Sequence, residues 1–186
     1  MWVFEKPLVT ERLVLRPFRE SDLEDLYAIQ SRADVARYIP YEARDKQEVA
    51  DSLAKFIKND RIGPENRALA IAVERTSDQR LIGTLTFWRD PEHRQGEVGY
   101  VFHPDAQGHG YATEAVTAAL DLAFGALDVH RIYGRVDARN RPSAALLGRL
   151  GMRQEAHLRE NEWFKGEWSD ELIFAVLAAE WAAGRH

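Results

Sequence analysis

The sequence contains no cysteine among its 186 residues. This absence excludes disulfide bonds, cysteine-based zinc sites and cysteine nucleophiles in one step. It fits a reducing compartment, although many exported proteins also lack cysteine. The six histidines show no H-E-x-x-H or similar ligand spacing. We therefore expect no metal site.

An excess of positive charge and long apolar runs are also missing. Acidic residues number 30 against 25 basic ones, for a net charge of −5, so there is no general electrostatic reason to expect nucleic-acid binding. No stretch approaches the ~20 apolar residues that a membrane-spanning helix needs. Charged residues early in the chain interrupt any signal-peptide core. We expect a soluble cytoplasmic protein without a membrane or nucleic-acid partner.

The chain also lacks internal repeats, low-complexity runs and long linkers. Its length suits one domain of ordinary size, with a core large enough to need no covalent staples. Hydrophobic residues make up 45% and charged residues 30%, the balance of a globular protein. We therefore expect residues 1–186 to form a single domain.

Hydrophobic periodicity predicts the order β-α-α-β-β-β-α-β-α-β-β. A capping box of Ser21 and Glu24 predicts the start of the first helix, and Gly151 is expected to end the last one. The predicted strands cover residues 12–18, 68–75, 81–90, 96–104 and 130–138, with two more between 152 and 178; the other helices cover 45–57, 111–124 and the residues after Pro142. Early hairpins and one central β-α-β unit predict a mixed α/β (α+β type) domain rather than a doubly wound parallel sheet.

Several aromatic residues can be assigned to a surface loop, the core or a substrate groove only from their residue type and neighbours. Tyr38 and Tyr41 flank Pro40, which breaks any helix there, so both are predicted in a surface loop. Four others fit either the core or a substrate groove, and the core is favoured for each: Trp88, Trp163, Phe164 and Trp168.

The segment QGHGYATEA, residues 107–115, places two glycines directly before a helix. It is not a dinucleotide fingerprint, because Thr113 stands where the third glycine is needed, and it lacks the Lys-Ser/Thr of a P-loop. The glycines could serve the backbone of a tight turn alone. Alternatively, the free amides at the helix N-terminus could bind a phosphate, which small residues would let approach.

Ordered motifs favour the second interpretation. Gln107-x-x-Gly110-x-Ala112 resembles the Q/R-x-x-G-x-G/A signature of the GNAT superfamily of acyl-CoA-dependent N-acetyltransferases. It follows the strand GEVGYVFHP and opens a helix. The later Asn140-x-x-Ser143 with LGM at 150–152 resembles a second family segment. The beginning, LVTERLVLRPFRESDLEDL, and the late WFKGEWSDELIFAVLAAEW resemble the RimJ/RimL-like branch, so the likeness spans nearly the whole chain.

This resemblance implies a single-domain fold with a mixed, mostly antiparallel sheet, flanked by helices and split at the acyl-CoA site. It implies acetyl-CoA as co-substrate, with its pantetheine arm along the backbone of Tyr100, Val101 and Phe102. The pyrophosphate would meet the amides of residues 107–113, namely Gln107, Gly108, His109, Gly110, Tyr111, Ala112 and Thr113. Asn140 would bind or orient the pantetheine arm, or cap the following helix, two roles that are compatible.

The implied reaction is direct attack of an amine on a thioester. The amine must lose a proton, and the departing thiolate benefits from one, although thiols with a pKa of ~8.5 need little help. Many relatives use a tyrosine as the acid seven residues after the asparagine, where this chain has Leu147. This departure favours Ser143 as the acid, or no acid at all, and Ser143 could also be simply a first-turn helix residue. Glu97 is the candidate base, acting through water, unless it is an exposed strand carboxylate.

The acceptor stays open at this stage. A protein N-terminal amine, as in ribosomal-protein acetyltransferases, is one alternative, and a small amine or antibiotic is the other. A non-catalytic acyl-CoA-binding protein is the rival from another class, and family habit suggests a homodimer.

Overall fold

The computed structural model describes residues 1–184, and its centre is a sheet with the strand order β2-β3-β5-β6-β7-β8-β10-β9. These strands are β2 (Leu8–Val9), β3 (Leu13–Arg16), β5 (Ala68–Arg75), β6 (Leu81–Asp90), β7 (Gln95–Phe102), β8 (Arg131–Asp137), β9 (Arg153–Phe164) and β10 (Glu167–Leu177). A separate pair is formed by β1 (Trp2–Val3) and β4 (Arg61–Ile62). All neighbours are antiparallel except β7 and β8, which confirms the mixed, mostly antiparallel sheet.

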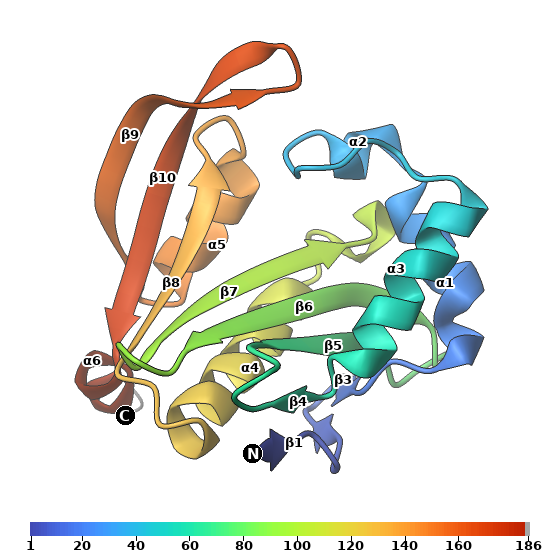
Figure 1. Cartoon of the computed structure of the whole chain (residues 1–186), viewed down its shortest axis with the longest axis horizontal. Helices are drawn as coiled ribbons and strands as arrows, with labels where there is room; N and C mark the ends of the chain where they lie inside the picture. The colour runs from blue at the N-terminus through green and yellow to red at the C-terminus, as the bar shows by residue number, and fades with distance from the viewer. Residues whose placement is uncertain (185–186) are drawn as a thin grey trace.

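Helices cover both faces of this sheet (Figure 1). They are α1 (Leu23–Gln30), α2 (Ala33–Ala36), α3 (Lys46–Lys58), α4 (Tyr111–Ala126), α5 (Arg141–Arg149) and α6 (Ala178–Ala183). On one face, α1 and α3 bury Leu26, Ile29 and Val49 against β5 and β6. On the other face, α4 and α5 supply small and branched residues to a larger core. The predicted order of the principal elements is confirmed; α2, α6 and three two-residue strands were not predicted.

The capping box predicted at Ser21 is wrong. A 3₁₀ turn, Glu20–Asp22, precedes α1, and the Asp22 carboxylate accepts the amide proton of Arg19 at 2.8 Å. A capping box is present at α3 instead, where Asp45 and Glu48 accept each other's amide protons, both at 2.9 Å. Ser21 lies inside the 3₁₀ turn, and Asp22, at the N-cap position of α1, makes no side-chain capping bond to that helix.

The core placement favoured for the tryptophans is also wrong. Trp163 is 64% exposed, Trp168 57% and Trp88 37%. Trp163 and Trp168 lie opposite each other in the β9–β10 hairpin and pack edge to face, with ring centroids 5.4 Å apart. Their side chains cover each other rather than the core. Phe164 is half-buried.

The sheet splits between its two parallel strands. β6 and β7 pair along their whole length, from Gly83↔Phe102 to Asp90↔Gln95. By contrast, β7 and β8 pair only from Gln95↔Arg131 to Glu97↔Tyr133, and then separate. Figure 1 shows the two strands diverging from this point. The split that the resemblance implied is therefore present, and the backbone from Tyr100 to Phe102 has no strand on that side.

A buried ion cluster fixes β3 to the 3₁₀ turn before α1 and to β5. The Arg16 guanidinium donates to both oxygens of Asp22, at 2.8 and 2.7 Å, and to Glu74 at 2.7 Å. The side chains of Arg16 and Asp22 are each only 5% exposed. Burial opposes the charge on Arg16, but these hydrogen bonds outweigh it, so its pKa is raised. Each member of the cluster therefore depends on the others.

We expect Asp22→Ala to destabilise the protein by about 3 kcal/mol, because removing one partner leaves a buried charge uncompensated. Urea unfolding measures the change. The matched control is Glu24→Ala, which breaks an exposed ion pair with Lys46 and should leave the unfolding midpoint almost unchanged. Equal effects of the two substitutions would contradict a structural role for the buried cluster.

Candidate active site

A cavity of about 690 Å³ opens at the split in the sheet. Its walls come from β7, the glycine turn, α4, α5 and the segment around α2. The lining residues are Asp34, Val35, Tyr38, Ile39, Tyr100, Val101, Phe102, Pro104, Ala106, Gln107, Gly108, Gly110, Ala112, Thr113, Asn140, Pro142, Ser143, Leu146 and Arg149. The cavity thus joins the glycine turn to the Asn140 segment, as the resemblance implied. The wall around α2 was not expected from the sequence.

The glycine turn has the geometry of an anion site. Gly108 and Gly110 adopt φ angles of +77° and +81°, which residues with a side chain rarely adopt. The helix bonding of α4 starts with the amide of Glu114, which donates to the carbonyl of Gly110 at 3.0 Å. The amide of Gln107 is used, because it donates to the carbonyl of Pro104 at 3.0 Å, whereas within residues 1–184 the amides from Gly108 to Thr113 have no helical acceptor. They lie at the positive end of the α4 dipole and fit a pyrophosphate.

The side chains of His109 and Tyr111 are not among those lining the cavity. The two rings stack, with centroids 5.7 Å apart, and Nδ1 of His109 lies 2.8 Å from the carbonyl oxygen of Gln107. A carbonyl only accepts, so this nitrogen carries the proton. Both residues remain proposed donors through their backbone amides alone. His103 is used locally, where its Nδ1 accepts the amide proton of Asp105 at 3.2 Å.

Arg12 braces the glycine turn from the beginning of the chain, a role that sequence reasoning missed. Its Nη1 donates to the carbonyl of His109 at 2.9 Å, and its Nε donates to Glu114 at 2.8 Å. Thr10 also donates to Glu114, at 2.6 Å. Burial opposes ionisation of Glu114, but the bonds from Thr10 and Arg12 outweigh it and lower its pKa. Arg12 therefore neutralises a carboxylate that lies one turn from the expected phosphate site.

Asn140 and Ser143 come together at the start of α5. The Oδ1 of Asn140 accepts the amide proton of Ser143 at 3.2 Å, so the capping role of Asn140 is confirmed. Its contact with pantetheine stays a proposal. Ser143 Oγ lies 2.8 Å from the hydroxyl of Tyr100, which reaches it from β7. This contact across the split links the two halves of the cavity.

Tyr100 was expected to contribute only its backbone, yet its hydroxyl faces the serine. Burial raises the pKa of Tyr100 to about 12, while the bond to Ser143 opposes the rise. The phenol therefore keeps its proton at neutral pH. When it donates to Ser143 Oγ, the serine proton is free to point into the cavity. No sequence motif marks this pairing, because residues 43 positions apart meet only in the fold.

Leu147 replaces the family's tyrosine and takes a packing role. It is 1% exposed and lies against Gly134 of β8, where an added Cβ would sit 3.1 Å from its Cδ1. A leucine in that position supplies no proton. Ser143 and Tyr100 are therefore the hydroxyl groups that we consider as donors to the leaving thiolate.

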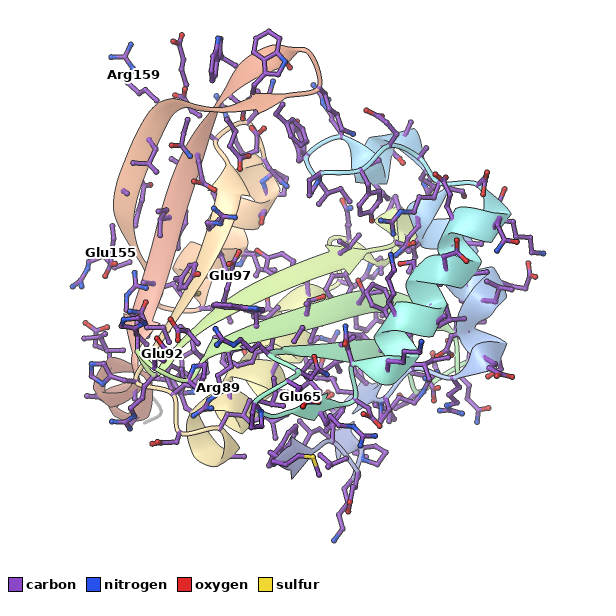
Figure 2. All side chains as sticks on the ribbon, viewed as in Figure 1. Glu65, Arg89, Glu92, Glu97, Glu155 and Arg159 are labelled. Atoms are coloured by element: carbon purple, nitrogen blue, oxygen red, sulfur yellow. The ribbon has the colours of Figure 1, made fainter. Side chains whose placement is uncertain are left out.

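Glu97 lies where β7 and β8 still pair, as Figure 2 shows, and is not among the residues lining the cavity. Since side chains alternate along a strand, Glu97 and Tyr100 point to opposite faces of β7. Glu97 shares Arg135 with Glu171: Arg135 lies 3.4 Å from each carboxylate. Burial, with neighbouring carboxylates, raises the pKa of Glu171 despite Arg135. Glu97 therefore belongs to a charged group on the face opposite Ser143.

Within residues 1–184, no cluster of histidine and carboxylate side chains has the arrangement of a metal site. No helix in the same part of the chain is long and apolar enough to cross a membrane.

Comparisons with known proteins agree with this geometry. The family model described as "Acetyltransferase (GNAT) domain" matches residues 12–153. The uncharacterised N-acetyltransferase YnaD of Bacillus subtilis is 30% identical over 94% of this chain and 98% of its own length. A spermidine N(1)-acetyltransferase of Vibrio cholerae is 26% identical, over 93% and 97% respectively. A ribosomal protein uS5 alanine N-acetyltransferase of Escherichia coli is 27% identical, over 96% and 94%.

Solved structures show the same fold. A GNAT-family acetyltransferase from Bacillus anthracis superimposes with a TM-score of 0.83 and 27% identity, over 94% of this chain and 100% of the other. The spermidine N-acetyltransferase from Vibrio cholerae, solved with CoA and spermine, gives a TM-score of 0.79 at 24% identity, over 93% and 99%. This chain belongs to the GNAT acetyltransferase family. It is an acyltransferase that uses acetyl-CoA as the donor.

We expect Arg12→Ala to weaken CoA binding about tenfold, because it leaves Glu114 as an unbalanced negative charge beside the phosphate turn. Isothermal titration with CoA measures this change. Arg12→Ala/Glu114→Gln removes both charges and should recover part of the affinity. An affinity that is unchanged in Arg12→Ala would contradict the bracing role.

Proposed function

We propose that the protein transfers the acetyl group directly to a primary amine, in the manner of the RimJ/RimL-like branch, with a protein N-terminal amine as the leading acceptor. The cavity wall at α2 supports this choice. Val35 and Ile39 are apolar, Tyr38 adds an aromatic ring, and Asp34, the one carboxylate that lines this part of the cavity, is paired with Arg32 at 2.9 and 2.8 Å. An N-terminal peptide carries one positive charge next to side chains that apolar walls can contact. The RimJ/RimL branch itself is supported by the motifs at both ends of the chain.

A small cationic amine such as spermidine is the second candidate. The carboxylates of Glu97 and Glu171 share a single arginine, so the face beyond the split carries excess negative charge. The relatives named as spermidine acetyltransferases agree with that chemistry. Both candidates are primary amines that are charged at neutral pH.

In the proposed mechanism, donor and acceptor approach the split from opposite faces. The pyrophosphate binds the amides from Gly108 to Thr113, since that of Gln107 already donates to Pro104, and the pantetheine arm follows the free backbone edge of Tyr100 to Phe102. The thioester then lies near Ser143. The amine arrives on the face of Glu97, which accepts its proton through water. The attacking nitrogen forms a bond to the carbonyl carbon and the carbon–sulfur bond breaks. The departing thiolate, stabilised by the serine hydroxyl, takes the second proton from the nitrogen, so that the amide and the CoA thiol are released.

Titration with acetyl-CoA followed by an amine panel tests the function. We expect binding in the micromolar range typical of substrates and turnover with a peptide bearing a free N-terminus. Spermidine competes in the same assay, and the ratio of the two kcat/KM values separates the candidates. Turnover with any amine excludes a non-catalytic acyl-CoA-binding protein. Absence of acetyl-CoA binding at hundreds of micromolar would end the proposal.

The proposed roles predict different pH dependences. Glu97→Gln should lower kcat about 100-fold and flatten the acidic limb of the pH–rate profile, because the proton acceptor is lost. Ser143→Ala should lower kcat about tenfold, the value of one hydrogen bond to a charged group. Tyr100→Phe is the matched variant, because it removes only the hydroxyl that orients Ser143. Since the pKa of Tyr100 is raised to about 12, its ionisation should cause no loss of activity up to pH 10. If Glu97→Gln and Ser143→Ala both retain full turnover, the roles are wrong even where the function holds.

A further inference from the structure

The β9–β10 hairpin extends beyond the strand that supports it. β10 pairs with β8 only as far as Glu171↔Asp137, whereas β9 and β10 continue to pair up to Phe164↔Glu167. Residues 159–170, called the arm here, therefore project past the end of β8. Figure 1 shows the arm leaning toward α2, and Figure 2 shows Arg159 pointing outward at its edge. A shift in register between Ser169 and Glu171 marks its base.

Lys165, in the turn of the arm, makes the contact with the opposite half of the molecule. Its ammonium donates to the carbonyl of Ala36 at 2.7 Å and to the carbonyl of Tyr41 at 2.9 Å. The Glu42 carboxylate lies 3.3 Å away. These three acceptors match the three donors of an ammonium group. The contact joins segments that are more than 120 residues apart in sequence.

The segment that receives Lys165 is itself held firmly. Arg44 Nη1 donates to Gln30 of α1 at 2.9 Å and to Ser52 of α3 at 3.0 Å. The same guanidinium lies 3.9 Å from the ring centroid of Tyr41. Residues 36–44 are thus tied to the helices, and they offer Lys165 a fixed anchor.

Little else holds the arm down. Its two tryptophans pack on each other and remain more than half exposed. Its other side-chain contacts are with its own half of the molecule: Ser169, at the base, donates to Asp137 at 2.9 Å, and Arg139 binds Glu167, next to the turn. Within residues 1–184, every hydrogen bond between the arm and the segment from α2 to α3 comes from Lys165. Releasing Lys165 would therefore free the tip from residues 36–42, while the contacts of Glu167 and Ser169 would keep the arm attached to its own half of the molecule.

The contact of Lys165 lies beside the cavity wall. Ala36 follows Val35, and Tyr38 and Ile39 lie in the same segment; all three of these neighbours line the cavity. The pairing of Glu97 with Tyr133 closes one end of the split, and the arm bridges the other end. No residue of the arm is among those lining the cavity, so the arm lies outside it, held by Lys165 against the segment that forms its α2 wall.

We propose that Lys165 is a latch that holds the arm against residues 36–42 and limits the size of the amine that can enter the cavity. The inference rests on the proposed function only in that the acceptor is an amine. A narrow amine passes while Lys165 holds the arm, whereas a bulky amine can enter only after Lys165 releases it.

The absence of cysteine permits a test that does not need a known acceptor. Val35→Cys places the chain's only thiol in the cavity wall, and its labelling rates with N-methylmaleimide and with the larger fluorescein maleimide are compared. Adding Lys165→Met should raise the rate with the larger reagent about tenfold, by shifting the arm toward its open state, and should change the smaller reagent's rate little. Lys165→Arg keeps the charge and should stay close to the parent. Equal acceleration of both reagents, or of neither, would overturn the latch.

A bridged variant covers the case in which Lys165→Met fails to fold. Glu42→Cys/Lys165→Cys, joined by a short bismaleimide, holds the arm closed in the full-length protein. We expect the bridged form to acetylate the linear amine found in the panel. With the same amine carrying a fluorophore beside its amino group, we expect bridging to lower turnover at least about tenfold relative to the unbridged protein. An unchanged preference would refute the proposal. If no amine is acetylated, the proposed function fails, and the labelling rates still decide the latch.

Discussion

The short pairing between β7 and β8 is the constraint on which the rest of the structure depends. These parallel strands pair over only three residue pairs, ending at Glu97↔Tyr133. Gly134 follows, and there Leu147 of α5 packs so closely that an added Cβ would lie 3.1 Å from its side chain. The same Cβ would lie 3.5 Å from the carbonyl oxygen of Val98. α5 thus packs against β8 at the point where the sheet opens, and the open backbone edge of β7 becomes available to a strand-like ligand.

The proposed donor site also depends on a distant part of the chain. The glycine turn offers amides and a helix dipole, but Glu114 places a carboxylate in the first turn of the same helix. Its charge would oppose a phosphate there. Arg12 offsets that charge with hydrogen bonds to both carboxylate oxygens and also fixes the turn through the carbonyl of His109. The beginning of the chain therefore contributes to the donor site through electrostatics, without lining the cavity.

Local patterns predicted what depends on local physics. The periodicity of β5 to β7 and α4, and the positive-φ turn at Gly108 and Gly110, are properties of neighbouring residues, and the structure has them as expected. The pairing of Tyr100 with Ser143, and of Arg12 with Glu114, joins residues far apart in sequence, so no motif indicates it. The tryptophans of the arm were misplaced for a related reason. Their apolar type favours burial, but burial requires a third strand, and β8 ends before it reaches them.

The alternation of side chains along β7 gives the two faces of the split their different chemistry. Tyr100 points toward α5, where it meets a serine hydroxyl and stays protonated because burial raises its pKa. Glu97, an odd number of residues away, must point to the other face, where it meets Arg135. One strand therefore carries a proton-donating group on the proposed donor side and a carboxylate on the proposed acceptor side. Leu147 stands where the resemblance implies a tyrosine in many relatives, and Tyr100 brings a hydroxyl to the same helix from the opposite wall of the cavity.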